Sequence, residues 1–178
     1  FGRLRLGHGG LIAVDSPGIE VEDNVFLCSV VGVAVSNCPG ARIAQNTIIG
    51  EGNYGVVVIP GAEDQKYRIE SNIFYRAIMG YKTGPNIWVM NMNPDLHSDR
   101  NVFYIAEGTK ATIGKLFHTN RLPTLETWQE ASGLDRNSIA AQPLFVDPEN
   151  ADFRLQPGSP GEGMGAEGGP AGARYDRM

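Results

Sequence analysis

Short apolar and polar stretches alternate along the first hundred residues, and one pattern of this kind occurs four times. Each copy, at residues 19–26, 41–48, 67–74 and 96–103, has one asparagine between two strand-like stretches. The four asparagines lie 22, 26 and 29 residues apart; they are Asn24, Asn46, Asn72 and Asn101. Self-similarity at this period is typical of a solenoid. We therefore expect a stack of β-coils.

A second pattern has the same period. Short β-branched stretches begin at Gly10, Gly32 and Gly55, which lie 22 and 23 residues apart. Equivalent positions around the asparagines are also mostly apolar, which indicates a shared interior. Three residues before each asparagine stand Val21, Ile43, Ile69 and Ser98, and two residues after it stand Phe26, Ile48, Phe74 and Phe103.

The asparagine lies where the chain must change direction between two strands. Asparagine tolerates a left-handed backbone, so we expect the asparagine itself to form the corner. Coils in such a stack are separated by about 4.8 Å, which lets side-chain amides of successive coils bond to one another. The sequence thus predicts a structural asparagine ladder.

These repeats resemble the right-handed parallel β-helix, the pectate-lyase-like solenoid of secreted polysaccharide lyases, glycoside hydrolases and epimerases. The resemblance implies an extracellular, cell-surface or periplasmic location and a polysaccharide or oligosaccharide as partner. The resemblance identifies the architecture well but the activity poorly, because one solenoid fold can host many different chemistries.

The C-terminal third differs from the repeats. Residues 123–132 have the pattern of a helix that Thr124 caps and Gly133 ends, and residues 142–160 have that of a β-hairpin. The acidic group from Asp147 to Asp152 has either the composition of a calcium loop or, as we favour, that of the hairpin turn. We predict an all-β fold of about four to five coils, divided into coils (1–118), capping helix and hairpin (119–160) and a Gly-rich tail (161–178).

The net charge of −5 argues against a nucleic-acid-binding protein, which would show a basic stripe. No apolar stretch has the length of a membrane span. Leu4 and Leu6 suggest the end of a preceding coil. We therefore expect either further N-terminal coils or self-association through the open first coil.

The two cysteines allow two interpretations. Cys28 and Cys38 are either buried thiols or, if the coil is flattened between them, a disulfide. Neither has another Cys or His at zinc-site spacing. We predict no metal site and no cofactor.

Candidate chemistry lies on outward positions beside the predicted core. Glu70, Asp99 and His97 are the candidate catalytic residues, because two close carboxylates can divide into an acid and a base when one pKa is raised. Glu70 and Asp99 should lie about 5 Å apart at the backbone if no coil is skipped. The candidate substrate-binding residues are Glu22, Arg42, Arg68, Lys82 and Trp88. The same charges also fit simple exposed ion pairs, and Trp88, like Tyr81, fits either a sugar-stacking platform or a buried strand.

The sequence therefore favours an extracellular carbohydrate-binding or carbohydrate-processing β-helix, similar to a glycoside hydrolase or polysaccharide lyase. The alternative is a non-catalytic assembly or adhesion module that stacks through its open end. A hydrolase requires two carboxylates converging in a groove, whereas an assembly module requires an uncapped end.

Overall fold

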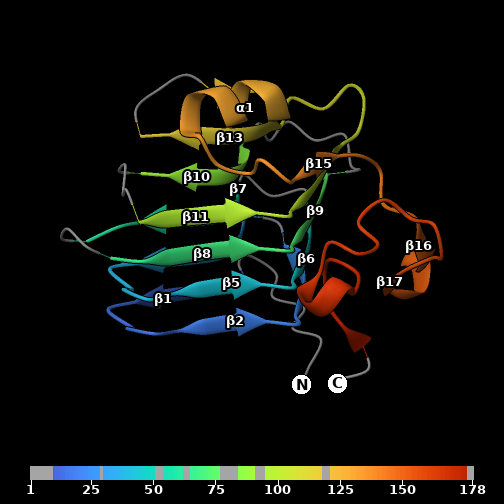
Figure 1. The fold of residues 1–178 in the computed structure, drawn as a ribbon, viewed down its shortest axis with the longest axis horizontal. Helices are drawn as coiled ribbons and strands as arrows, with labels where there is room; N and C mark the ends of the chain where they lie inside the picture. Colours follow the sequence, from blue (N-terminus) through green and yellow to red (C-terminus); the bar gives the residue numbers. More distant parts are fainter. Residues whose placement is uncertain are drawn as a thin grey trace.

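A computed structural model describes residues 10–28, 30–50, 54–61, 65–76, 84–90, 95–117 and 121–175, without the side chain of Cys28. The predicted strand at Leu4 and Leu6, the candidate Lys82 and its neighbour Tyr81 lie outside these residues. The chain is a β-solenoid whose strands form three parallel sheets (Figure 1).

Each sheet takes one strand from each successive coil. The first sheet contains β1 (Leu11–Val14), β4 (Val31–Ser36), β7 (Tyr54–Ile59), β10 (Pro85–Val89), β13 (Thr112–Leu116) and the antiparallel β14 (Arg121–Leu122). The second contains β2 (Glu20–Glu22), β5 (Arg42–Ala44), β8 (Tyr67–Glu70) and β11 (Leu96–Asp99). The third contains β3 (Val25–Cys28), β6 (Thr47–Gly50), β9 (Ile73–Arg76), β12 (Val102–Ile105) and β15 (Ile139–Ala140).

The predicted solenoid is confirmed, although the coil count is slightly lower than expected. The chain makes about three turns from β1 to β10, where four to five coils were predicted. The glycines that open the strands of the first sheet have a steric reason. A Cβ on Gly55 would lie 2.5 Å from the carbonyl oxygen of Asn86 in the next coil, so only glycine fits there.

The predicted interior columns are confirmed. Val21, Ile43, Ile69 and Ser98 are at most 2% exposed, and the column from Phe26 to Phe103 is at most 8% exposed. Phe74 and Phe103 stack with ring centroids 5.1 Å apart. Residues that lie more than twenty positions apart in sequence therefore share one core along the solenoid axis.

The asparagine ladder is also present. The Nδ2 atoms of Asn24, Asn46 and Asn72 each donate to the Oδ1 atom of the next asparagine, at 3.2, 3.1 and 3.1 Å. Asn101 ends the ladder, because its Nδ2 donates to the buried carboxylate of Asp135 at 2.8 Å. The same Oδ1 atoms also accept the backbone N–H of the preceding asparagine in the ladder.

The predicted position of the corner was wrong by one residue. The left-handed backbone belongs to the residue before each asparagine, namely Asp23, Gln45, Ser71 and Arg100, with φ between 53° and 57°. The asparagine side chain instead points inward, where Asn46 Nδ2 donates to the backbone oxygens of Val21 and Ala44. The preceding residue therefore makes the bend, and its side chain takes no part in the asparagine ladder.

The helix α1 (Leu125–Ser132) covers the C-terminal end of the stack, as predicted (Figure 1). Thr124 forms a capping box with Thr127, and Gly133 ends the helix with φ 74°. Trp128 is fully buried and donates from Nε1 to Asp135 Oδ2 at 2.8 Å. The helix is thus joined to the end of the asparagine ladder.

The hairpin of β16 (Phe145–Asp147) and β17 (Asp152–Leu155) packs against the outer face of the third sheet. Its turn is the short helix η1 (Pro148–Asn150), which Asp147 caps, so this acidic group builds the predicted turn. The Gly-rich segment, including η2 (Ala166–Gly168), covers the same sheet. On the first sheet, Ile12 and Val14 of β1 are 68% and 56% exposed.

Cys38 is a buried free thiol, and its Sγ lies 3.2 Å from the carbonyl oxygen of Ser36. The side chain of Cys28, the other half of the proposed disulfide, lies outside the described part of the chain.

Candidate functional site

The outer face of the second sheet carries two columns of polar side chains. Glu20, Arg42, Arg68 and His97 are register partners on β2, β5, β8 and β11. Glu22, Ala44, Glu70 and Asp99 form the second column in the same way. Asp99 pairs directly with Glu70, so the long segment between Asn72 and Leu96 does not separate the two strands. The expected juxtaposition of these two carboxylates at the backbone is therefore found.

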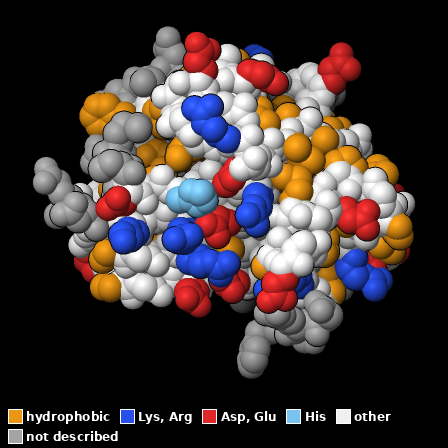
Figure 2. All heavy atoms as spheres, in the orientation of Figure 1, with side chains coloured by type: hydrophobic (Ala, Val, Ile, Leu, Met, Phe, Trp, Pro, Cys, Tyr) orange, Lys and Arg blue, Asp and Glu red, His pale blue; other side chains and the backbone are white. Residues whose placement is uncertain are grey.

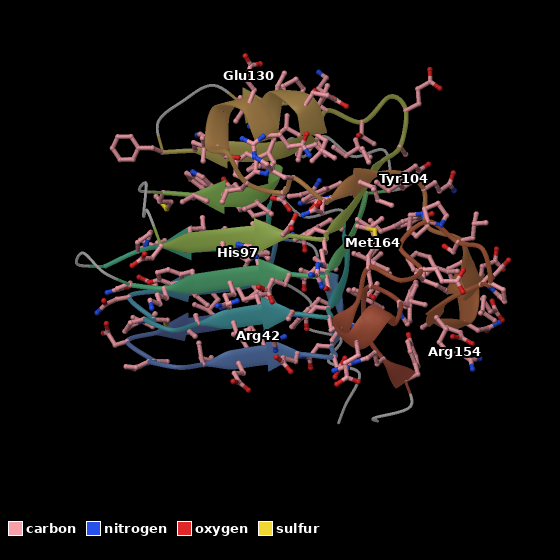
Figure 3. All side chains as sticks on the ribbon, viewed as in Figure 1. Arg42, His97, Tyr104, Glu130, Arg154 and Met164 are labelled. Atoms are coloured by element: carbon pink, nitrogen blue, oxygen red, sulfur yellow. The ribbon has the colours of Figure 1, made fainter. Side chains whose placement is uncertain are left out.

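A groove of about 400 Å³ lies over these columns. Its lining residues are Arg42, Gln45, Arg68, Glu70, Ser71, His97, Asp99, Arg100 and Ala166. Figure 2 shows the same region as a cluster of basic and acidic side chains around a histidine. Figure 3 shows His97 and Arg42 on the faces of their strands, on the same side of the sheet. Almost all of the side chains around this groove can donate or accept hydrogen bonds.

Glu70 lies among the arginine and histidine side chains of the groove. Its Oε1 accepts from Arg68 Nη1 at 3.1 Å and lies 3.4 Å from His97 Nε2, and its Oε2 lies 4.0 Å from Arg42 Nε. Arg42 also contacts the carboxylate of Glu22. The side chains of Arg68 and His97 are 60% and 55% exposed, so both can turn toward a ligand with little loss of stability.

Asp99 has different partners. Asn137, from the segment after α1, donates from its backbone N–H and its Nδ2 to the two carboxylate oxygens, each at 2.7 Å. Partial burial would raise the pKa of Asp99, but the hydrogen bonds from Asn137 and Arg100, together with His97, outweigh burial and lower it. An acid catalyst must hold a proton near neutral pH. The lowered pKa therefore suits Asp99 as a fixed negative charge or a base, not as an acid.

Three further groove residues belong to one column that was not predicted as a site, although Arg100, like Lys82, stands out in the sequence as an isolated basic residue near the polar columns. Gln45, Ser71 and Arg100 are the left-handed corner residues of successive coils. Their position immediately before the ladder asparagines is the sequence signal that could have found them. Arg100 is exposed, and its guanidinium has no hydrogen-bond or ion-pair partner within the described residues.

The remaining wall of the groove comes from the C-terminal segment, through Ala166. Asn137 and Ala166 both lie far along the chain from the repeats, and no repeat pattern marks them. Sequence periodicity could not have placed either beside the groove.

Trp88 lies elsewhere, on the outer face of the first sheet. Its ring lies 4.9 Å from the ring of Tyr54 on β7, and Lys115 Nζ on β13 lies 4.8 Å from its centroid. The neighbouring strands on both sides of β10 thus supply contacts to this half-buried ring. Trp88 is not part of the groove, and its proposed sugar contact stays a prediction. Lys82 lies outside the described residues.

Within the described ranges, no group of three or more His, Cys, Asp or Glu residues is placed to hold a metal ion. In the same ranges, no helix has the length and apolar character needed to cross a membrane.

Comparison of the chain with protein-family models, with curated proteins and with solved structures gave no match.

Proposed function

We propose that this chain is a carbohydrate-binding β-solenoid of the pectate-lyase-like kind, acting outside the cell or at its surface, with the groove of the second sheet as its saccharide site. The observation that supports this most is the composition of the groove. Arg42, Arg68, Arg100 and His97 supply donors beside the acceptors Glu70 and Asp99. A ligand rich in hydroxyl groups needs both kinds of partner over a short distance.

The geometry favours binding over a complete catalytic site. The carboxylates of Glu70 and Asp99 lie on paired positions, but the lowered pKa of Asp99 leaves Glu70 as the only acid candidate of this pair. The proposal extends to processing of the bound glycan, by hydrolysis or by elimination. Glu70, Asp99 and His97 are the catalytic residues of this proposed reaction.

The test is binding of the purified protein to a glycan array, followed by calorimetry with the glycans that bind. Arg68→Ala should weaken binding about tenfold, as expected for one lost charge-assisted hydrogen bond. Arg154→Ala is the matched control, because Arg154 lies on the hairpin and pairs with Asp152 away from the groove (Figure 3). Absence of any glycan ligand, or equal binding by both variants, would reject the proposed site.

A second candidate function is assembly through the N-terminal end of the stack. The specific observation is the exposure of Ile12 and Val14 on β1, which is the edge strand of its sheet among the described residues. Exposed apolar residues on an edge strand favour association with another chain. The opposite end is covered by α1, so two copies cannot stack head to tail through that end.

A further inference from the structure

The corner residues of successive coils form a row along one side of the groove. This corner row consists of Asp23, Gln45, Ser71 and Arg100, all with left-handed φ. The left-handed backbone turns each side chain away from the core, where the ladder asparagine already fills the inner position. The C-terminal segment, residues 161–175 (the tail), is bound to the first three members of this row.

Gln45 makes three hydrogen bonds with the tail. Its Nε2 donates to the backbone oxygens of Pro170 and Gly172, at 3.1 and 3.2 Å, and its Oε1 accepts the backbone N–H of Ala166 at 3.2 Å. It is only 1% exposed although it lies on the outside of the solenoid. Both ends of one buried amide are therefore satisfied by the tail, and losing the tail would leave them without these partners.

The neighbouring corner residues hold the tail in the same place. Ser71 Oγ donates to the Met164 carbonyl at 2.8 Å, and the Ser71 carbonyl accepts the N–H of Gly172 at 2.8 Å. Arg174 forms a two-pronged ion pair with Asp23, at 2.8 and 2.7 Å. The tail is thus bound at three successive coils.

The tail sequence fits this position closely. Gly172 has φ 82°, and a Cβ there would lie 2.6 Å from Thr47 Oγ1 and 2.7 Å from Ile73 Cδ1. The N–H of Ala173 donates to Thr47 Oγ1 at 3.0 Å. A Gly-rich segment is usually a flexible linker. Here glycine allows the backbone to approach the sheet closely.

The fourth member of the row, Arg100, is exposed and lines the groove beyond the tail. Along the corner row, the tail lies against Gln45 through Ala166 and against Ser71 through Met164. Among the described residues, the exposed Arg100 makes no hydrogen bond with the tail.

We infer that Gln45 is a positioning residue, which fixes the tail as a wall of the groove so that a bound saccharide can extend past the corner only beside Arg100. This inference rests on the proposed function in taking the groove as the saccharide site. The position of the wall is measurable without any ligand.

The first test is hydrogen–deuterium exchange on the whole protein and on Gln45→Ala. The informative amides are those of Gly172 and Ala173, because their own acceptors, Ser71 O and Thr47 Oγ1, are unchanged in the variant. If Gln45 fixes the wall, both amides exchange about tenfold faster or more, since the tail opens locally. Unchanged exchange at these two amides would overturn the inference.

Two controls separate this effect from general instability. The ladder amides of Asn46 and Asn72 should keep their protection in Gln45→Ala. Gln156→Ala removes another bond from glutamine to backbone, to Phe145 in the hairpin, and should leave Gly172 protected. Should Gln45→Ala fail to fold, Ser71→Ala removes the bond to Met164 and serves as the second variant, with the same expected result.

The second test measures the affinity of the protein for the glycan identified on the array, at increasing lengths of the glycan chain. In the parent protein, Arg100→Ala should weaken the binding of long glycan chains about tenfold. In the Gln45→Ala background, Arg100→Ala should weaken this binding less, because a long chain can then pass the corner at another position. The same loss of affinity in both backgrounds would overturn the inference. If the parent protein binds no glycan, the proposed function fails, and exchange at Gly172 and Ala173 alone decides whether Gln45 fixes the tail.

Discussion

Asn137 holds both carboxylate oxygens of Asp99 with two hydrogen bonds of 2.7 Å, across 38 residues of sequence. The pair joins the segment after the capping helix to the last strand of the second sheet. It fixes the position and the charge of one of the two carboxylates in the groove. Asp99 is therefore held by the fold itself before any ligand arrives.

Asn137→Ala should raise the pKa of Asp99 toward its ordinary value of 3.8, because the variant removes the side-chain bond that lowers it. A depressed pKa contributes stability above about pH 4 that is lost as the pH falls through the folded pKa. The parent protein should therefore lose more unfolding free energy on acidification than the variant, by about 1 kcal/mol for this partly exposed group. Urea unfolding at pH 7 and pH 3 measures it; equal losses would contradict the role of Asn137.

Asn46→Leu should lower the unfolding free energy by about 1–3 kcal/mol for each buried partner left unpaired. Asn46 donates to Val21 O, Ala44 O and Asn72 Oδ1, and it is fully buried. Asn24→Leu is the matched control, because Asn24 is the first member of the ladder and is only partly buried, so its loss should cost less. A thermal transition unchanged in Asn46→Leu would show that the ladder does not stabilise the stack.

Asp135→Asn should destabilise the fold by about 1–3 kcal/mol. Ser98, Asn101, Trp128 and Ser138 all donate to this carboxylate, and an amide offers one acceptor oxygen in place of two. Burial raises the pKa of Asp135, although the four hydrogen bonds oppose it. A raised pKa means that this group stabilises the fold less as pH rises above about 4. The variant should lack this component of the pH dependence, which denaturant unfolding between pH 4 and 8 can detect.

The assembly alternative predicts that Ile12→Lys reduces self-association, because it places a charge on the exposed face of the edge strand β1. Light scattering across a concentration series measures the effect, with Leu144→Lys at the hairpin as the control, because Leu144 is also an exposed apolar residue. A parent protein that stays monomeric at all concentrations would leave the assembly function without support.

The repeated asparagines were enough to predict the solenoid, its core columns and the register of Glu70 with Asp99, because each coil repeats the same local requirement. The corner position was misassigned by one residue, since asparagine suits both a left-handed bend and an inward amide. The walls of the groove could not be predicted in the same way. Asn137 and Ala166 reach it through contacts between segments distant in sequence, and only the folded chain brings them together.

The catalytic form of the proposed function predicts that Glu70→Gln and Asp99→Asn each abolish glycan turnover, by about 10²–10⁴-fold, which is typical for loss of a general acid or base. Glu70→Gln preserves shape on a partly exposed face, so its thermal transition should stay in place. Asp99→Asn replaces one oxygen that accepts from Asn137 with an NH2 group, so its transition should fall slightly while the protein stays folded at the assay temperature. Glu130→Gln, on the exposed side of α1 and far from the groove, is the matched control (Figure 3). Turnover is measured as new reducing ends, and ultraviolet absorbance of unsaturated products separates elimination from hydrolysis. If both variants turn the glycan over as fast as the parent protein, Glu70 and Asp99 do not catalyse the reaction; if only Asp99→Asn retains turnover, Asp99 is a fixed charge that binds and Glu70 alone acts on the glycan.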